Sequence, residues 1–210
     1  MKIPKEYVER CKESNWDFDY ASNKIDRSRF NVFARIKRDI SYNSIAPSSN
    51  KITKTENTPA VNQIIANGQR AGDRFELFLC NETWGNEFVE LANLIPWKTY
   101  SVHIHRQLPG HMHPFHMDFP TVKGMNHEDK LQKVRRCWIM LDDWYPGQVV
   151  QMGNHVWTKW KKGDVVYFDW QNLPHGTSNF GHHPRPIIST VGFTTPAFEE
   201  AIKSIRPIIL

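Results

Sequence analysis

Cysteine is scarce in this chain. Cys11, Cys80 and Cys137 are scattered through 210 residues, and no two of them form a CxxC pair. An odd, dispersed set argues against a disulfide framework and against a structural zinc site. Long apolar runs are also missing, because no stretch approaches the ~20 apolar residues of a membrane span and the amino terminus lacks the apolar core of a signal peptide. We therefore expect a soluble cytoplasmic protein with reduced thiols and no membrane partner.

A strong excess of one charge is absent as well. The formal net charge is +5, with basic residues concentrated between Arg27 and Arg38 and again between Lys133 and Arg136. A moderate positive charge is usual for a soluble surface, so we do not expect nucleic acid as the partner. The chain has 40% apolar residues and its length suits one well-packed domain.

What is present is a series of short β-rich runs. The predicted strands are Arg74–Cys80, Lys98–Arg106, Arg136–Leu141, Gln148–Met152, Val156–Trp160 and Asp164–Trp170. Turn residues separate the last four, and Lys161 to Asp164 is predicted to form a tight turn. Closely spaced strands without an intervening helical pattern favour an antiparallel barrel or sandwich.

We predict a single domain over residues 1–210. Residues 1–73 are expected to form an extension of helix and loop, with a short amphipathic helix over Pro4–Ser14 and a surface loop over Ser44–Pro59. Residues 74–198 are expected to form the barrel, and residues 199–210 a tail.

The tripeptide His116-Met117-Asp118 is the first candidate for metal chemistry. Residues two apart in an extended segment point to the same side, so its imidazole and carboxylate can reach one ion. The spacing is weak evidence by itself, because His127-Glu128-Asp129 repeats it within a polar run. Prolines and phenylalanines surround the His116 copy and favour it as the functional one.

Two downstream residues complete the pattern. His175 follows Asp118 by 57 positions and Arg185 lies ten further on. Two imidazoles and one carboxylate can hold one face of a ferrous ion and leave the other positions open. The planar fork of Arg185 can hold a carboxylate in a water-poor pocket. If residues 182–184 form a hairpin loop, His175 and Arg185 share one face, about 20 Å apart along the strands.

These residues resemble those of the iron(II)- and 2-oxoglutarate-dependent dioxygenases. The resemblance covers roughly Thr99 to Phe198, and its matching elements are His116-x-Asp118, His175, Arg185 and the strand Lys162–Asp169. It implies a mainly β fold, a double-stranded β-helix or jelly-roll barrel of the cupin group, here with N-terminal helical additions.

The resemblance also implies a function. Iron(II) held by His116, Asp118 and His175 would bind 2-oxoglutarate, with Arg185 on its far carboxylate, and dioxygen would be used to hydroxylate a substrate with release of succinate and carbon dioxide. The substrate would be a small molecule or an amino-acid, peptide or protein side chain.

Within that superfamily the segment from Arg136 to Phe193 looks most like the aspartyl/asparaginyl β-hydroxylase branch. An Arg-x-His element of that branch corresponds to Arg136-Cys137-Trp138, which implies Arg136 and Trp138 as further cosubstrate contacts, and Ser189 is a candidate on the strand of Arg185. Two departures stand out: the branch typically has glycine at the position of Asp118, and a tryptophan replaces the imidazole at 138.

Two alternatives stay open. The barrel of a cupin can carry a metal for structure or sensing only, with His111, His113 and His116 as ligands and His155 or His175 completing the set. The same oxygenase chemistry can also act on nucleic acid, but that group usually has a second arginine on the strand of the cosubstrate arginine, and here none follows Arg185 until Arg206.

Overall fold

The computed structural model describes residues 27–38, 51–52, 76–80, 85–118 and 134–210. The predicted helix over Pro4–Ser14 and most of the predicted loop over Ser44–Pro59 lie outside these ranges. Among the described residues, no helix has the length and apolar character that a membrane-spanning helix needs.

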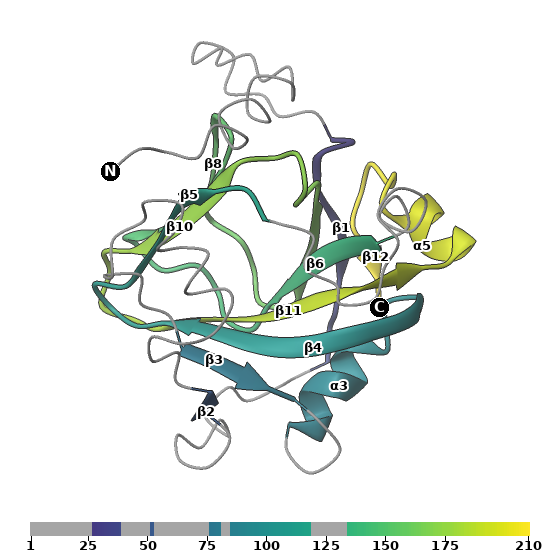
Figure 1. Ribbon diagram of the computed structural model, residues 1–210, viewed down its shortest axis with the longest axis horizontal. Helices are drawn as coiled ribbons and strands as arrows, with labels where there is room; N and C mark the ends of the chain where they lie inside the picture. The colour runs from purple at the N-terminus through teal and green to yellow at the C-terminus, as the bar shows by residue number, and fades with distance from the viewer. Residues whose placement is uncertain (1–26, 39–50, 53–75, 81–84, 119–133) are drawn as a thin grey trace.

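Twelve strands form two sheets within the described residues (Figure 1). The eight-stranded sheet has the order β12-β1-β9-β6-β11-β4-β3-β2, and the four-stranded sheet has the order β5-β10-β7-β8. Their bounds are β1 Phe30–Arg35, β2 Lys51–Ile52, β3 Glu76–Leu79, β4 Trp97–Gln107, β5 Met112–His116, β6 Val134–Met140, β7 Gln148–Met152, β8 His155–Trp157, β9 Asp164–Phe168, β10 His175–Asn179, β11 Arg185–Thr194 and β12 Ile208–Ile209.

The path of the chain identifies the fold. From β4 to β11 each strand crosses to the opposite sheet, except at the β7–β8 hairpin, and the pairing is antiparallel throughout. A chain that alternates in this way winds as a double-stranded β-helix, the jelly-roll arrangement of cupins. The predicted mainly β, cupin-like barrel is therefore confirmed.

Alternation within the strands creates two apolar cores. Trp138, Met140 and Ile187 point between the sheets and pack with Val150 and Met152 of the four-stranded sheet. The intervening residues point to the other side of the eight-stranded sheet, where they pack with the helices α3 (Asn86–Ala92) and α5 (Pro196–Ala201). The central strands are therefore buried on both faces, which explains their continuous apolar character.

The turn before β9 forms where predicted. Asp164 donates its backbone N–H to Lys161 O, and Gly163 has φ +84, in the left-handed region. A Cβ at Gly163 would lie 2.0 Å from Ile36 O, so glycine is required both by conformation and by the close passage of the chain after β1. The predicted strand Val156–Trp160 ends earlier, at Trp157, since Lys159 takes a positive φ of 58.

One expectation about strand pairing needs correction. β10 and β11 do not form a hairpin, because β10 pairs with β5 and β7 whereas β11 pairs with β4 and β6. The predicted boundaries at residues 73 and 198 stay predictions, but β1 lies within the expected extension and is nevertheless a sheet strand beside β9. In the expected tail, β12 pairs with β1.

Candidate metal centre

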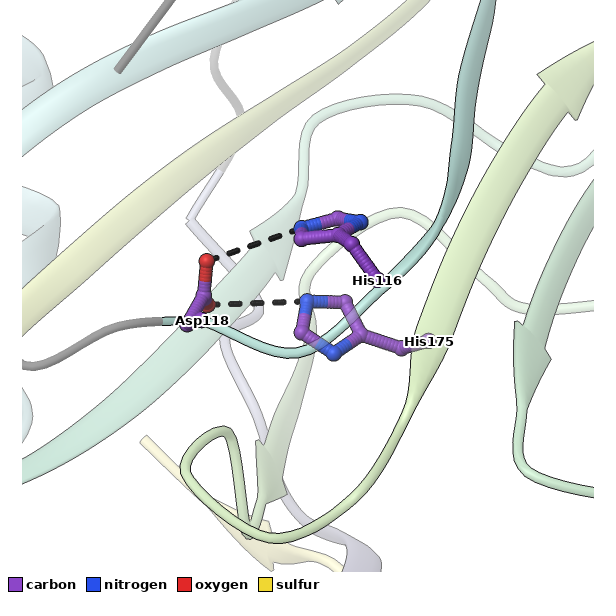
Figure 2. Close-up of side chains that lie close together, drawn as sticks. All are labelled: His116, Asp118 and His175. Atoms are coloured by element: carbon purple, nitrogen blue, oxygen red, sulfur yellow. Dashed lines mark ion pairs between the residues drawn. The ribbon is translucent and has the colours of Figure 1, made fainter. Parts of the chain in front are cut away.

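Three side chains gather where β5 and β10 lie side by side. His116 closes β5, Asp118 follows two residues later, and His175 opens β10 directly opposite His116 in the register. Figure 2 shows both imidazoles pointing toward the Asp118 carboxylate. One ligand atom from each residue lies within 4.8 Å of the others, and no other group of three among the described residues meets this criterion.

The local sequence explains the position of each ligand. β10 begins after the turn Trp170–Pro174, so His175 is the first extended residue of the strand. Its Nδ1 lies 2.9 Å from Leu173 O, and a carbonyl oxygen only accepts, so Nδ1 carries the proton. The Nε2 lone pair then faces Asp118 Oδ2 at 3.5 Å.

The geometry of these three side chains suits a bound cation. His116 Nε2 lies 3.5 Å from Asp118 Oδ1, as His175 Nε2 does from Oδ2. Burial, followed by the charge of His116, lowers the pKa of His175, which keeps it neutral near pH 7. A lone pair opposite a carboxylate oxygen is unfavourable unless a positive ion lies between them, so the donor set fits a divalent metal.

Asp118 is held in its ionised form. Burial by itself would raise the pKa of this carboxyl, but Arg136 and the two histidines outweigh that effect and leave the pKa well below its usual range. Arg136 Nη1 lies 2.5 Å from Asp118 Oδ2, and its guanidinium lies 5.1 Å from the centre of the Trp170 ring. Arg136 therefore supports the acidic ligand in this structure.

Arg185 lies inside the same barrel as the three metal-ligand side chains. It opens β11, is 3% exposed, and alternates with Ile187 and Ser189 on the face between the sheets. Its Nε and Nη2 donate to Gln107 Oε1 at 3.0 and 2.7 Å, while Nη1 has no hydrogen-bond partner in the described part of the chain. Burial lowers the pKa of Arg185 to about 9, so it stays charged at neutral pH without an acidic partner among the described residues.

Trp138 and Ser189 are neighbours across β6 and β11. They are in register, 5% and 2% exposed, and Trp138 lies 6.1 Å from the His175 ring, centre to centre. The indole Nε1–H of Trp138 is buried without a partner among the described residues. Like Nη1 of Arg185, it is a buried donor without a partner in the described ranges.

The rival ligand set is not assembled. His111 accepts from the backbone N–H of Leu108, and His155 packs against Phe30 with ring centres 5.4 Å apart. Neither joins a group of three metal-ligand side chains within the described residues. His113 does lie beside His116, with ring centres 4.0 Å apart, as a neighbour of the set.

Gln107 and Thr177 belong to this interior and are not apparent from the sequence motifs. Gln107 Nε2 donates to Thr177 Oγ1 at 2.7 Å, which joins β4 of one sheet to β10 of the other. The sequence signal that could have placed them there is the alternation of side chains along a strand. Thr177 follows His175 by two residues, and Gln107 continues the alternation of His103 and His105, so each shares a face with those histidines.

Comparisons with known proteins add the following. No family model and no curated protein matches the chain by sequence. Among solved structures, a collagen prolyl hydroxylase of Paramecium bursaria Chlorella virus-1, in a 2OG complex, has 12% identity and a TM-score of 0.44, covering 58% of this chain and 80% of that one. A Pseudomonas putida prolyl-4-hydroxylase has 12% identity and a TM-score of 0.44, covering 65% and 83%.

A protein not described as a hydroxylase is also similar. The cupin domain of Cnp3 from Schizosaccharomyces pombe has 9% identity and a TM-score of 0.36, covering 60% of this chain and 69% of that one. Matches at this level do not separate an enzyme from a binding module, so the fold rests on the strand order and the function on the site. The chain has the double-stranded β-helix fold of the cupin type.

Proposed function

We propose that this chain is an iron(II)- and 2-oxoglutarate-dependent oxygenase. It would hydroxylate a small molecule or an amino-acid, peptide or protein side chain, with release of succinate and carbon dioxide. The observation that carries the proposal is a combination within one barrel: a two-histidine, one-carboxylate group and a buried arginine without an acidic partner among the described residues. The first fits a metal with open positions, and the second fits a ligand carboxylate.

His116, Asp118 and His175 would hold the iron. The Leu173 carbonyl fixes the His175 tautomer, and Arg136 keeps Asp118 ionised and oriented, as hydrogen-bond partners of metal ligands commonly do. When bound, iron(II) supplies the chemistry by which dioxygen is reduced at the expense of the cosubstrate and the substrate is oxidised.

Arg185 would pair with the far carboxylate of 2-oxoglutarate. Its burial strengthens that pairing, since water competes little in the interior. The unused Nε1–H of Trp138 is a further donor to the cosubstrate, and Ser189, next to it in register, is another. Arg136 is a weaker candidate for this contact because one of its amino groups already pairs with Asp118.

We also propose that this chain is most similar to the aspartyl/asparaginyl β-hydroxylase branch of the superfamily. The resemblance to aspartyl/asparaginyl β-hydroxylases rests on sequence, and Asp118 and Trp138 depart from that pattern. We therefore do not carry that branch's substrate over. A cytoplasmic location is proposed too, and it suits the two buried free thiols of Cys80 and Cys137.

Succinate formation tests the proposal. Purified protein with iron(II), 2-oxoglutarate, dioxygen and a panel of amino acids and peptides should produce succinate, and His175→Ala or Asp118→Ala should lower the rate by about 100-fold or more, because each removes a direct ligand. His182→Ala, at an exposed position between β10 and β11, is the control and should keep the rate. Iron-independent succinate formation, or full activity in His175→Ala, would contradict the proposal.

A further inference from the structure

The side chain of Gln107 links the two sheets inside the barrel. Gln107 ends β4 and is 2% exposed. Its carbonyl oxygen accepts from Arg185, and its amide nitrogen donates to Thr177 Oγ1 on the opposite sheet. All four of these polar groups are buried, so the orientation of the amide is fixed by partners on both sides.

This contact uses only one edge of the arginine. A guanidinium has five N–H groups, and Gln107 takes one from Nε and one from Nη2, which lie on its side edge. The end edge, formed by Nη1 and the outer hydrogen of Nη2, has no partner among the described residues. That edge has the parallel pair of donors that a carboxylate accepts in a bidentate contact.

The partner of Arg185 is also uncharged. A glutamate would have the same shape at position 107 and would pair with the arginine more strongly, but it would cancel the positive charge. An amide holds the guanidinium in place and leaves the charge available to a ligand. Structural stability alone would favour the glutamate, since a buried charge is costly without a counter-charge.

The network also connects Arg185 with the metal ligands. Thr177 lies two residues after His175 on the same face of β10, a separation of about 6.6 Å along the strand. From Thr177, one glutamine side chain reaches the guanidinium. A five-carbon chain with four C–C bonds of about 1.52 Å spans roughly 5 Å between its end carbons. This length is of the same order as the separation of about 6.6 Å between His175 and Thr177.

We propose that Gln107 is a positioning residue of the cosubstrate site: it holds Arg185 by the side edge and leaves the end edge and the positive charge for the far carboxylate of a dicarboxylic 2-oxo acid. The inference rests on the proposed function and deepens it. It assigns to Gln107 the selection of a dicarboxylic over a neutral cosubstrate.

Calorimetry with two matched ligands tests this role. Protein loaded with manganese(II), a stand-in for iron without oxygen chemistry, is titrated with 2-oxoglutarate and with 2-oxoglutaramate, whose far end is a neutral amide. The native protein should prefer the dicarboxylate by about 100-fold, as expected for a desolvated charge pair. Gln107→Glu should reduce that preference to about threefold or less, while its affinities for manganese(II) and for the neutral ligand stay within about threefold of native.

Gln151→Glu is the matched control, because it adds the same charge on the outward face of β7 and should keep the native preference. The inference is overturned if Gln107→Glu retains the preference, or if it loses the neutral ligand and the metal as well, since that result marks a purely structural role. Failure of the native protein to bind 2-oxoglutarate when loaded with metal would instead overturn the proposed function.

Discussion

At the residue scale, the balance of charge around Asp118 defines the site. One carboxylate faces two imidazoles and one guanidinium, and Arg136 helps to hold the pKa of Asp118 well below its usual range. His175 and His113 are the histidines near the site whose pKa burial lowers most clearly. In the metal-free protein, these two histidines therefore take up a proton less readily than they do in the unfolded chain. This difference in pKa makes the free energy of unfolding depend on pH.

Acid should destabilise the metal-free protein below about pH 6.5. The folded pKa of His175 lies below its unfolded value of about 6.5, so as the pH falls the unfolded chain binds the proton first, and the free energy of unfolding drops until the folded pKa is reached. Each such histidine contributes at most about 1.4 kcal/mol per pH unit.

Urea unfolding of metal-free protein at pH 7.5, 6.5 and 5.5 measures this slope. His175→Gln should make it shallower, whereas His182→Gln, at an exposed position, should leave it unchanged. An equal slope in His175→Gln and native protein would show that the neutral state of His175 is not what costs stability in acid.

The residue scale also shows where sequence reasoning ends. His116, Asp118, His175 and Arg185 could be selected from residue type and spacing, because metal and carboxylate chemistry restrict both. Parity could place Gln107 on the inner face of its strand, but its contact with Arg185 could not be predicted, since the two residues lie 78 positions apart and a glutamine on a strand has no chemical signature. The contact depends on β4 pairing with β11, which is a property of the sheet.

At the scale of elements, local signals predicted strands well and their partners poorly. β7 forms over the predicted residues, and β9 begins at the predicted Asp164 because a glycine turn fixes the start of the strand. The expected β10–β11 hairpin was wrong because alternation within a strand is the same whichever strand lies beside it. Arg185 still faces the interior, since β11 lies in the opposite sheet of the same barrel and its alternate residues point between the sheets.

The pairing of β5 with β10 sets the distance between the two histidine ligands. Gly176 follows His175, and a Cβ there would lie 3.1 Å from His113 O and 3.1 Å from Phe115 Cα, both backbone atoms of β5. Gly176→Val should push β5 away from β10, separate His116 from His175 and weaken metal binding by about tenfold or more.

Titration of iron(II) under anaerobic conditions measures this effect. Ser178→Val is the control, because it adds the same side chain on the same strand and face, two residues further from the ligands. If both variants bind iron(II) as the native protein does, the spacing of the two strands is not what tunes the site.

At the scale of the whole molecule, strands from both ends of the described chain extend the eight-stranded sheet. β1 pairs with β9 along the sheet and with β12 on its other side (Figure 1). Asn31 of β1 also binds the segment that follows α5. The Asn31 amide donates to Ile202 O at 2.9 Å and to Ser204 O at 2.8 Å, and the side chain is mostly buried.

Asn31→Ala should lower the free energy of unfolding by about 2 kcal/mol, because one buried and one part-buried carbonyl group lose their donor. Arg27→Ala is the control, since it removes an exposed hydrogen bond to Ile205 O of the same segment and should cost less than about 0.5 kcal/mol. Chemical denaturation of both variants gives the comparison, and equal losses would mean that the segment is not fastened through Asn31.

The barrel as a whole brings the three metal-ligand side chains and the buried guanidinium of Arg185 into one interior. The central claim is that the bound metal and Arg185 hold the two ends of one ligand. Calorimetry of 2-oxoglutarate binding, with and without iron(II) and in the absence of oxygen, tests this most directly. We predict tight binding to the iron-loaded protein, at least about tenfold weaker binding without metal, and loss of that difference in Asp118→Ala. Binding of equal strength with and without iron would contradict the account.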